Sequence, residues 1–214
     1  MGRPGPFGHA EDMSELKALA LVCTLKPSPT PSSSDLIARE VLTALTENGV
    51  GGTDLVRIVD HDVKHGVALD MGDGDEWPAI RERVMAADIL VVATPVWMGQ
   101  PSSVAKKVLE RLDSELSETD ESGRNYTYGK VAAVAVVGNE DGAHHVSAEL
   151  YQGLSDVGYT IPANGVTYWV GTAMEPTDYL DLDPKPQTTA STTKTLAQNA
   201  VHLATLLRRE NYPV

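Results

Sequence analysis

LKALALVCTLKPSPTPSSSD, residues 16–35, is the stretch that indicates the fold of this chain. Its first ten residues form a short apolar run between polar segments, as in a strand that is buried on both faces of a sheet. Three prolines then end the strand, and the sequence SSSD at residues 32–35 offers several N-cap residues for a following helix. The stretch therefore predicts a strand, a proline-rich loop and the start of a helix.

The same alternation of strand and helix continues along the rest of the chain. The predicted strands cover residues 16–25, 53–59, 89–96, 130–137 and 165–170. A helical spacing of apolar residues follows each strand, around residues 37–45, 77–87, 104–116, 145–157 and 196–207. Strands and helices that alternate in this way form a parallel sheet with helices on both faces. We therefore predict an α/β fold, a flavodoxin-like doubly wound five-stranded parallel sheet with the strand order 2-1-3-4-5.

Length and composition are those of one acidic domain. We expect this domain to span residues 16–214, after a disordered lead-in at residues 1–15 that is rich in glycine and proline. The formal net charge of -13 argues against nucleic acid and anionic membranes as partners. The single cysteine, Cys23, excludes an internal disulfide and favours a cytoplasmic location. No apolar run is long enough to predict a membrane span.

The predicted topology indicates where a ligand would bind. In open α/β sheets, ligands bind beyond the carboxyl ends of the strands, at the point where the strand order reverses. That point lies between the first and third predicted strands. The loops after the first, third and fourth strands are therefore the places to search for a site.

The loop after the first strand, TLKPSPTPSSS, has the features of a phosphate site. It leads into the N-terminus of a helix, where backbone N–H groups and the helix dipole attract anions. Lys26 adds a positive charge, and the hydroxyl groups of the loop can donate hydrogen bonds to phosphate oxygens. The hydroxyl donors are those of Thr24, Ser32, Ser33 and Ser34. The alternative is an ordinary loop with a capped helix.

The loop after the third strand, TPVWMGQPSS, has the features of a binding site for a planar ring. Pro95 and Gly99 shape the backbone so that it can approach a flat ligand closely. Trp97 can stack on an aromatic ring. The alternative is a simple connection in which Trp97 packs on the end of the sheet.

The loop after the fourth strand, GNEDGAHH, is rich in glycine and polar side chains. Its polar groups can bind the carbonyl and N–H edge of a ring that lies over the same crevice. His144 and His145 are adjacent and point in different directions, so at most one of them faces the site. Each histidine taken alone is a surface or packing residue.

These three loops, in this order, resemble those of the flavodoxin-like NADPH-dependent FMN reductase and NAD(P)H quinone reductase family. The resemblance covers roughly residues 16–183. It implies that the first loop binds the FMN phosphate and that the other two bind the isoalloxazine ring. The implied FMN-binding residues are Thr24, Lys26, Ser32, Ser33, Ser34, Pro95, Val96, Trp97, Met98, Gly99, Gly138, Asn139, Asp141, Gly142 and His144.

The resemblance also implies a function. It indicates an FMN-dependent oxidoreductase that uses NADPH or NADH to reduce a flavin, a quinone or a similar small-molecule acceptor. No side chain need act as a catalytic acid or base, and no metal site is predicted. The resemblance implies a homodimer or homotetramer, and residues 171–184 are a candidate lid over the ring. Two alternatives remain: an electron carrier of the flavodoxin type that serves a protein partner, and a binding or regulatory module without chemistry.

Overall fold

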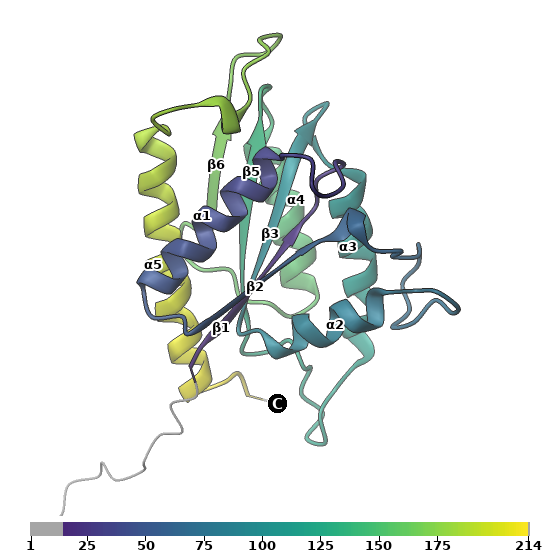
Figure 1. Cartoon of the computed structure of the whole chain (residues 1–214). Coiled ribbons are helices and arrows are strands. Elements are labelled where there is room, and N and C mark those ends of the chain that lie inside the picture. Colours follow the sequence, from purple (N-terminus) through teal and green to yellow (C-terminus); the bar gives the residue numbers. More distant parts are fainter. Residues whose placement is uncertain (1–14, 214) are drawn as a thin grey trace, which may run out of the picture.

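Five parallel strands form the centre of the protein, with helices on both faces (Figure 1). The structure is a computed structural model and describes residues 15–213. The strands lie in the order β2-β1-β3-β5-β6, which is the predicted 2-1-3-4-5 order when the parallel strands are counted along the chain. Their bounds are β1 Lys17–Val22, β2 Gly52–Arg57, β3 Ile89–Trp97, β5 Val131–Gly138 and β6 Val166–Val170. The predicted fold class is confirmed, and the predicted lead-in at residues 1–15 lies, apart from Glu15, outside the described residues.

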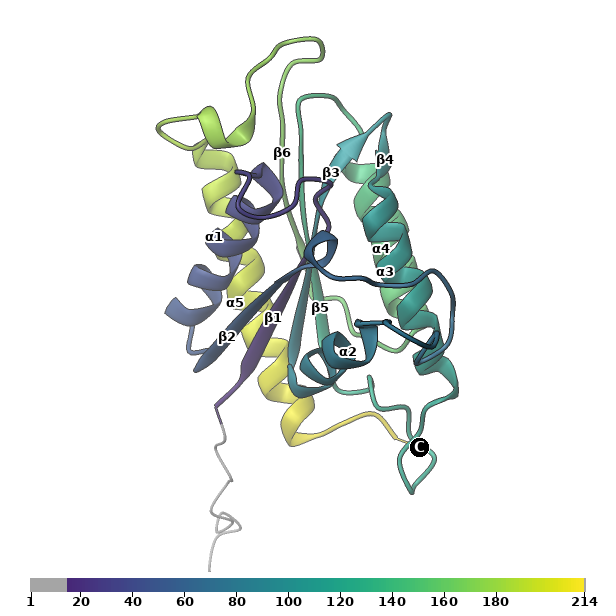
Figure 2. The same cartoon turned by 45° about the vertical axis from the view of Figure 1, so that its right-hand side comes forward.

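The helices form one layer on each face of the sheet, as Figure 2 shows with the sheet nearly edge-on. Helices α1 (Ser33–Glu47) and α5 (Gln187–Arg209) cover one face. Helices α2 (Trp77–Ala86), α3 (Ser103–Leu112) and α4 (Ala143–Asp156) cover the other. Short 3-10 turns lie at η1 (Ile58–Asp60), η2 (Asp113–Ser117) and η3 (Tyr179–Asp181). Each helical layer buries an apolar stripe, so the core consists of two layers with the sheet between them.

The central strands β1, β3 and β5 are apolar along almost their whole length because helices cover both of their faces. In β5, the first seven residues are buried, and the last, Gly138, is partly exposed. Cys23, which follows β1, is fully buried, and burial raises the pKa of its thiol far above the usual range. The thiol is therefore unreactive in the folded protein.

One element was not predicted. Strand β4 (Gln100–Pro101) turns back on the end of β3 and pairs with it antiparallel, Val96 opposite Pro101 and Trp97 opposite Gln100. The turn between them has two residues with positive φ, 54° at Met98 and 72° at Gly99. The predicted loop is therefore a tight hairpin.

A buried ion pair fastens the long connection between β2 and α2 to helix α3. The guanidinium of Arg111 lies 2.8 Å from a carboxylate oxygen of Asp75, and both side chains are 0% exposed. Arg111 also donates to the carbonyls of Lys64 and Leu69, each at 3.2 Å. Burial alone would raise the pKa of Asp75, but N–H donors from Met71, Lys64 and Trp77, together with Arg111, hold that pKa below its usual range. Removal of either partner would therefore leave an uncompensated charge in the protein interior.

Candidate functional site

A cleft of about 130 Å³, open to solvent, lies at the carboxyl ends of β1, β3 and β5. It is the position that the strand order predicts, because the order reverses between β1 and β3. Ten of the fifteen predicted binding residues line it. They are Thr24, Lys26, Ser32, Ser33, Ser34, Pro95, Val96, Trp97, Gly138 and Asn139.

The N-terminus of α1 forms one end of this cleft. Ser32 is the N-cap residue, and its hydroxyl accepts from the N–H of Asp35. Among residues 15–213, the N–H groups of Ser33 and Ser34 have no hydrogen-bond partner, as is usual for the first turn of a helix. Lys26 lies on the same side of the loop and is exposed. These donors and this charge form a cradle for an anion.

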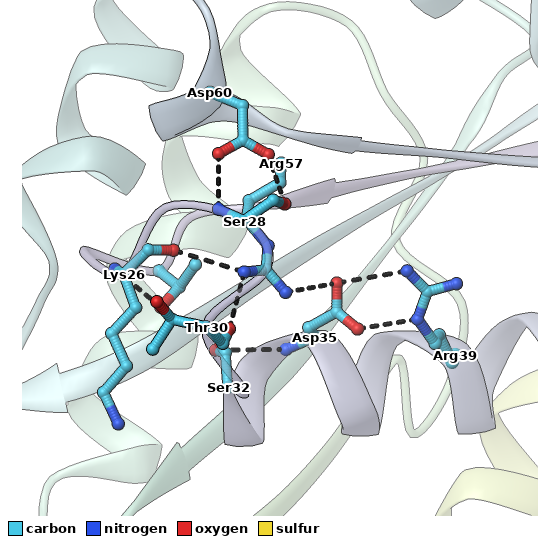
Figure 3. A network of polar contacts seen from close by, with 9 residues as sticks. Lys26, Ser28, Thr30, Ser32, Asp35, Arg39, Arg57 and Asp60 are labelled. Atoms are coloured by element: carbon cyan, nitrogen blue, oxygen red, sulfur yellow. Dashed lines mark hydrogen bonds and ion pairs between the residues drawn. The ribbon is translucent and has the colours of Figure 1, made fainter.

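Arg57, at the end of β2, holds the loop that carries Lys26 (Figure 3). Its side chain donates to the carbonyl of Thr30 at 2.8 Å and to that of Lys26 at 3.4 Å. It also contacts the carboxylate of Asp35 at 3.0 Å, and that carboxylate is held by Arg39 as well, at 2.6 Å. Burial would raise the pKa of Asp35, but its bonds to Arg39 and Arg57 outweigh burial and lower it. Two guanidinium groups therefore neutralise the one carboxylate in the first turn of α1, and the local charge still favours an anion.

Asp60 fixes the middle of the same loop. Its carboxylate accepts from the N–H of Ser28 at 2.7 Å and from the Ser28 hydroxyl at 2.5 Å. These two bonds lower the pKa of Asp60, the hydroxyl bond most strongly. In Figure 3 the ammonium group of Lys26 points away from Arg57 and Asp60. The loop is thus shaped by two residues from the β2 end, while its lysine stays available.

The other end of the cleft is apolar and aromatic. Pro95, Val96 and Trp97 come from β3, and the Trp97 side chain is 54% exposed at the mouth. Trp169 of β6 and Tyr179 of η3, with ring centroids 5.7 Å apart, form a further aromatic wall, and the segment of Tyr179 packs on α1. A cleft that combines an anion cradle with apolar and aromatic walls suits a ligand that has a phosphate and a flat ring.

The remaining five predicted residues do not line the cleft. The Met98 side chain is 90% exposed at the tip of the hairpin, and Asp141 is exposed. Gly99 and Gly142 pack backbone to backbone, since a Cβ added to Gly142 would lie 2.8 Å from the Gly99 Cα. His144 contacts Tyr168 edge to face, with centroids 5.2 Å apart, on the sheet face that α4 covers. Met98 and Gly99 form the tip of the β3–β4 hairpin, Gly142 packs on that tip, and His144 packs on Tyr168, so these residues shape the loops instead of lining the cleft.

Six lining residues are not among the predicted FMN-binding residues. They are Leu25, Val137, Glu140, Trp169, Asp178 and Tyr179. Leu25, Val137 and Glu140 are adjacent in sequence to predicted residues, and this adjacency could have identified them as lining residues. Trp169 lies within a strand, where no local pattern marks it, and Asp178 and Tyr179 lie within the candidate lid at residues 171–184.

Tyr179 reaches the cleft because the segment around it packs on α1. Its hydroxyl donates to a carboxylate oxygen of Glu40 at 2.6 Å, and the N–H of Leu180 donates to the Ser33 hydroxyl at 3.3 Å. Burial, and next the bond to Glu40, raise the pKa of Tyr179. Residue Met174, which was placed in the candidate lid, is fully exposed. Part of residues 171–184 is therefore a fixed wall of the cleft, and its role as a moving lid stays a prediction.

Comparisons with known proteins point to flavin chemistry. Residues 16–175 match the family described as NADPH-dependent FMN reductase. The 8-demethyl-8-aminoriboflavin-5'-phosphate synthase of Streptomyces davaonensis is 32% identical over 207 residues, which cover 92% of this chain and 80% of that protein. A Mycobacterium bovis protein named divalent metal cation transporter MntH is 38% identical over 200 residues, 90% of this chain but 29% of that protein. The chain thus spans less than a third of that relative, and within residues 15–213 no helix has the length and apolar character to cross a membrane.

Solved structures give the same result for the fold. The crystal structure of RosB with bound 8-demethyl-8-formylriboflavin-5'-phosphate superposes with a TM-score of 0.83 at 32% identity, covering 92% of this chain and 82% of that one. An oxidoreductase from Corynebacterium diphtheriae has a TM-score of 0.61 at 19% identity, covering 92% and 98%. The NADH:FMN oxidoreductase EMOB has a TM-score of 0.57 at 16% identity, covering 89% of each chain. At the two lower identities the likeness shows the fold alone.

Proposed function

The chain belongs to the NADPH-dependent FMN reductase family. We propose that it is an FMN-dependent oxidoreductase that uses NAD(P)H, and that the cleft at the carboxyl ends of β1, β3 and β5 is its flavin site. The observation that carries this proposal is the anion cradle at the N-terminus of α1. Its unpartnered N–H groups on Ser33 and Ser34, and the nearby charge of Lys26, suit a phosphate monoester.

The rest of the cleft fits the remainder of FMN. Val96 and Trp169 supply apolar wall, and Trp97 presents an exposed aromatic face at the mouth. These side chains would exclude water from a bound ring and orient it. The bound flavin supplies two-electron transfer between NAD(P)H and the acceptor. The protein's part is binding and orientation, so no lining side chain need act as an acid or base.

The acceptor and the oligomeric state follow from the family resemblance, and the cytoplasmic location follows from the single cysteine. The acceptor in this proposal is a small molecule such as a quinone or a free flavin. The protein acts in the cytoplasm as a homodimer or homotetramer, with neither nucleic acid nor membrane as partner. The net charge of -13 supports the exclusion of polyanionic partners.

Titration and stopped-flow mixing test the proposal. FMN should bind more tightly than riboflavin, because only FMN has a phosphate for the cradle of α1. Anaerobic mixing of the FMN-loaded protein with NADPH or NADH should bleach the flavin band at about 1 per second or faster with at least one nucleotide, and added quinone should restore it. Equal affinities would refute the phosphate assignment. Bleaching over hours, with rapid reduction by a protein reductase, would show an electron carrier instead.

A second candidate function rests on the likeness to RosB. Its TM-score of 0.83 and 32% identity exceed the 0.61 and 19% of the Corynebacterium diphtheriae oxidoreductase. In this alternative, FMN is the substrate and is altered at its 8-position, as the name of the Streptomyces davaonensis relative describes for that protein. The mass of the flavin recovered after aerobic incubation with amine donors decides between them. An unchanged mass after many turnovers of NAD(P)H supports the reductase, and a changed mass supports the alternative.

Lys26→Ala should weaken FMN binding by about tenfold. A hydrogen bond to a charged group is worth about 1.5–3 kcal/mol, and the low end applies because Lys26 is exposed and screened by salt. Riboflavin binding should hardly change. Lys17→Ala, an exposed lysine at the opposite end of β1, is the matched control. Isothermal titration with both ligands measures the effect, and an equal loss for both would show that Lys26 does not serve the phosphate.

A further inference from the structure

Glu140 joins the two loops at the ring end of the cleft. It lies between β5 and α4, and its Oε1 accepts from the N–H of Met98 at 2.7 Å. It also lines the cleft beside Trp97. A single carboxylate thus connects the loop after β5 with the tip of the β3–β4 hairpin.

The hairpin tip needs such a contact. Met98 has φ 54° and Gly99 has φ 72°, so both turn residues are in the left-handed region. Glycine adopts this conformation freely, whereas a residue with a Cβ does so at a cost. The Met98 side chain is 90% exposed and contributes little packing that would hold it. The bond from its N–H to Glu140 is therefore a principal restraint on the turn.

Two close backbone contacts make the position of the hairpin specific. Gly142 touches Gly99, and a Cβ added to Gly138 would lie 2.8 Å from the Cβ of Val96. Glu140 lies between these two glycines in the chain. The loop after β5 therefore supports the hairpin at three successive points, of which Glu140 alone acts through a side chain.

We propose that Glu140 is a positioning residue, which holds the Met98–Gly99 turn so that Trp97 stays at the wall of the cleft. This inference rests on the proposed flavin site, because in that site the position of Trp97 affects how the flavin ring is bound. Glu140 acts through the hairpin and takes no part in electron transfer. Its carboxylate is needed as a hydrogen-bond acceptor, a role that an amide oxygen can fill.

Two variants of Glu140 separate this role from a purely electrostatic one. Glu140→Ala removes the acceptor and should weaken FMN binding about tenfold. Glu140→Gln keeps an acceptor without the charge and should bind FMN within about threefold of the wild type, or more tightly. Loss of affinity by an equal factor in both variants would overturn the proposal, because the charge and not the acceptor would then matter.

Met98→Gly tests the turn itself. Glycine needs no help to adopt a positive φ, so adding Met98→Gly to Glu140→Ala should restore a large part of the FMN affinity. In the wild-type background the same change should have a small effect. A double variant as weak as Glu140→Ala would contradict a role through the turn.

Quenching of tryptophan fluorescence by acrylamide gives a readout without flavin. Glu140→Ala should raise the quenching of Trp97, measured as the difference from the same protein carrying Trp97→Phe, and Glu140→Gln should not. Unchanged quenching in Glu140→Ala would overturn the proposal even if FMN binding fell. If the wild type did not bind FMN, the flavin site would be wrong, while the quenching would still report whether Glu140 holds the hairpin.

Discussion

Replacement of Arg111 by leucine should lower the free energy of unfolding by about 3–5 kcal/mol, as is usual when one partner of a buried ion pair is removed. The carboxylate of Asp75 would remain, 0% exposed, without its cation. The carbonyls of Lys64 and Leu69 would lose their donor as well. Urea denaturation followed by circular dichroism measures the change.

Arg83→Leu is the matched control for this loss. Arg83 and Asp54 also form a close pair, at 2.6 Å, but their side chains are 37% and 53% exposed. Water replaces such a pair easily, so its removal should cost at most about 1 kcal/mol. Similar losses in the two variants would show that burial does not set the energy of the Arg111–Asp75 pair.

Gly142→Ala should be costly for both stability and flavin binding. Gly142 has φ 121°, and the added Cβ would lie 2.8 Å from the Cα and 3.1 Å from the carbonyl oxygen of Gly99. Backbone atoms cannot rotate aside, so either the hairpin moves or the start of α4 does. We expect a loss of about 2–4 kcal/mol in stability from strain and overpacking combined. FMN affinity should fall about tenfold or more, because a displaced hairpin moves Trp97.

Gly49→Ala is the control that separates the cost of the steric clash at Gly142 from the cost of a positive φ. Gly49 has φ 103°, but a Cβ there would have no atom of residues 15–213 within 4 Å. Its replacement therefore measures the cost of a positive φ alone, about 1–2 kcal/mol. Thermal unfolding of both variants, with FMN titration, gives the comparison. A Gly142→Ala protein no less stable than Gly49→Ala, with normal FMN affinity, would mean that the two loops do not support one another.

The order of elements was predictable from the sequence because each buried strand is a short apolar run between turn residues. The hairpin at β4 was not, since the two-residue turn has methionine at its first position, where Asn or Asp would have been the signal. The start of α5 was also placed too late. Its first turns bury threonines such as Thr189 and Thr193 against Thr167, so they lack an apolar stripe.

The phosphate end of the cleft was predictable for a similar reason. Thr24, Lys26 and Ser32 to Ser34 are continuous with a strand end and a helix start, and topology places such a loop at the switch point. Tyr179 lies in the candidate lid but was not among the predicted binding residues, because only the packing of its segment on Glu40 brings its side chain to the wall of the cleft. His144 was placed in the site by its loop, yet the start of α4 directs it toward Tyr168 on the other face.

Because Arg57 and Asp60 hold the loop after β1, the conformation of that loop does not depend on its own sequence alone. Its sequence is local, but its conformation is imposed from the neighbouring strand, through the carbonyls of Lys26 and Thr30 and the N–H of Ser28. Transplanted into another protein of this fold, residues 24–34 would not keep their shape unless Arg57 and Asp60 were transferred with them. The structural unit is therefore the loop after β1 together with the end of β2, and a redesign of this loop has to include both.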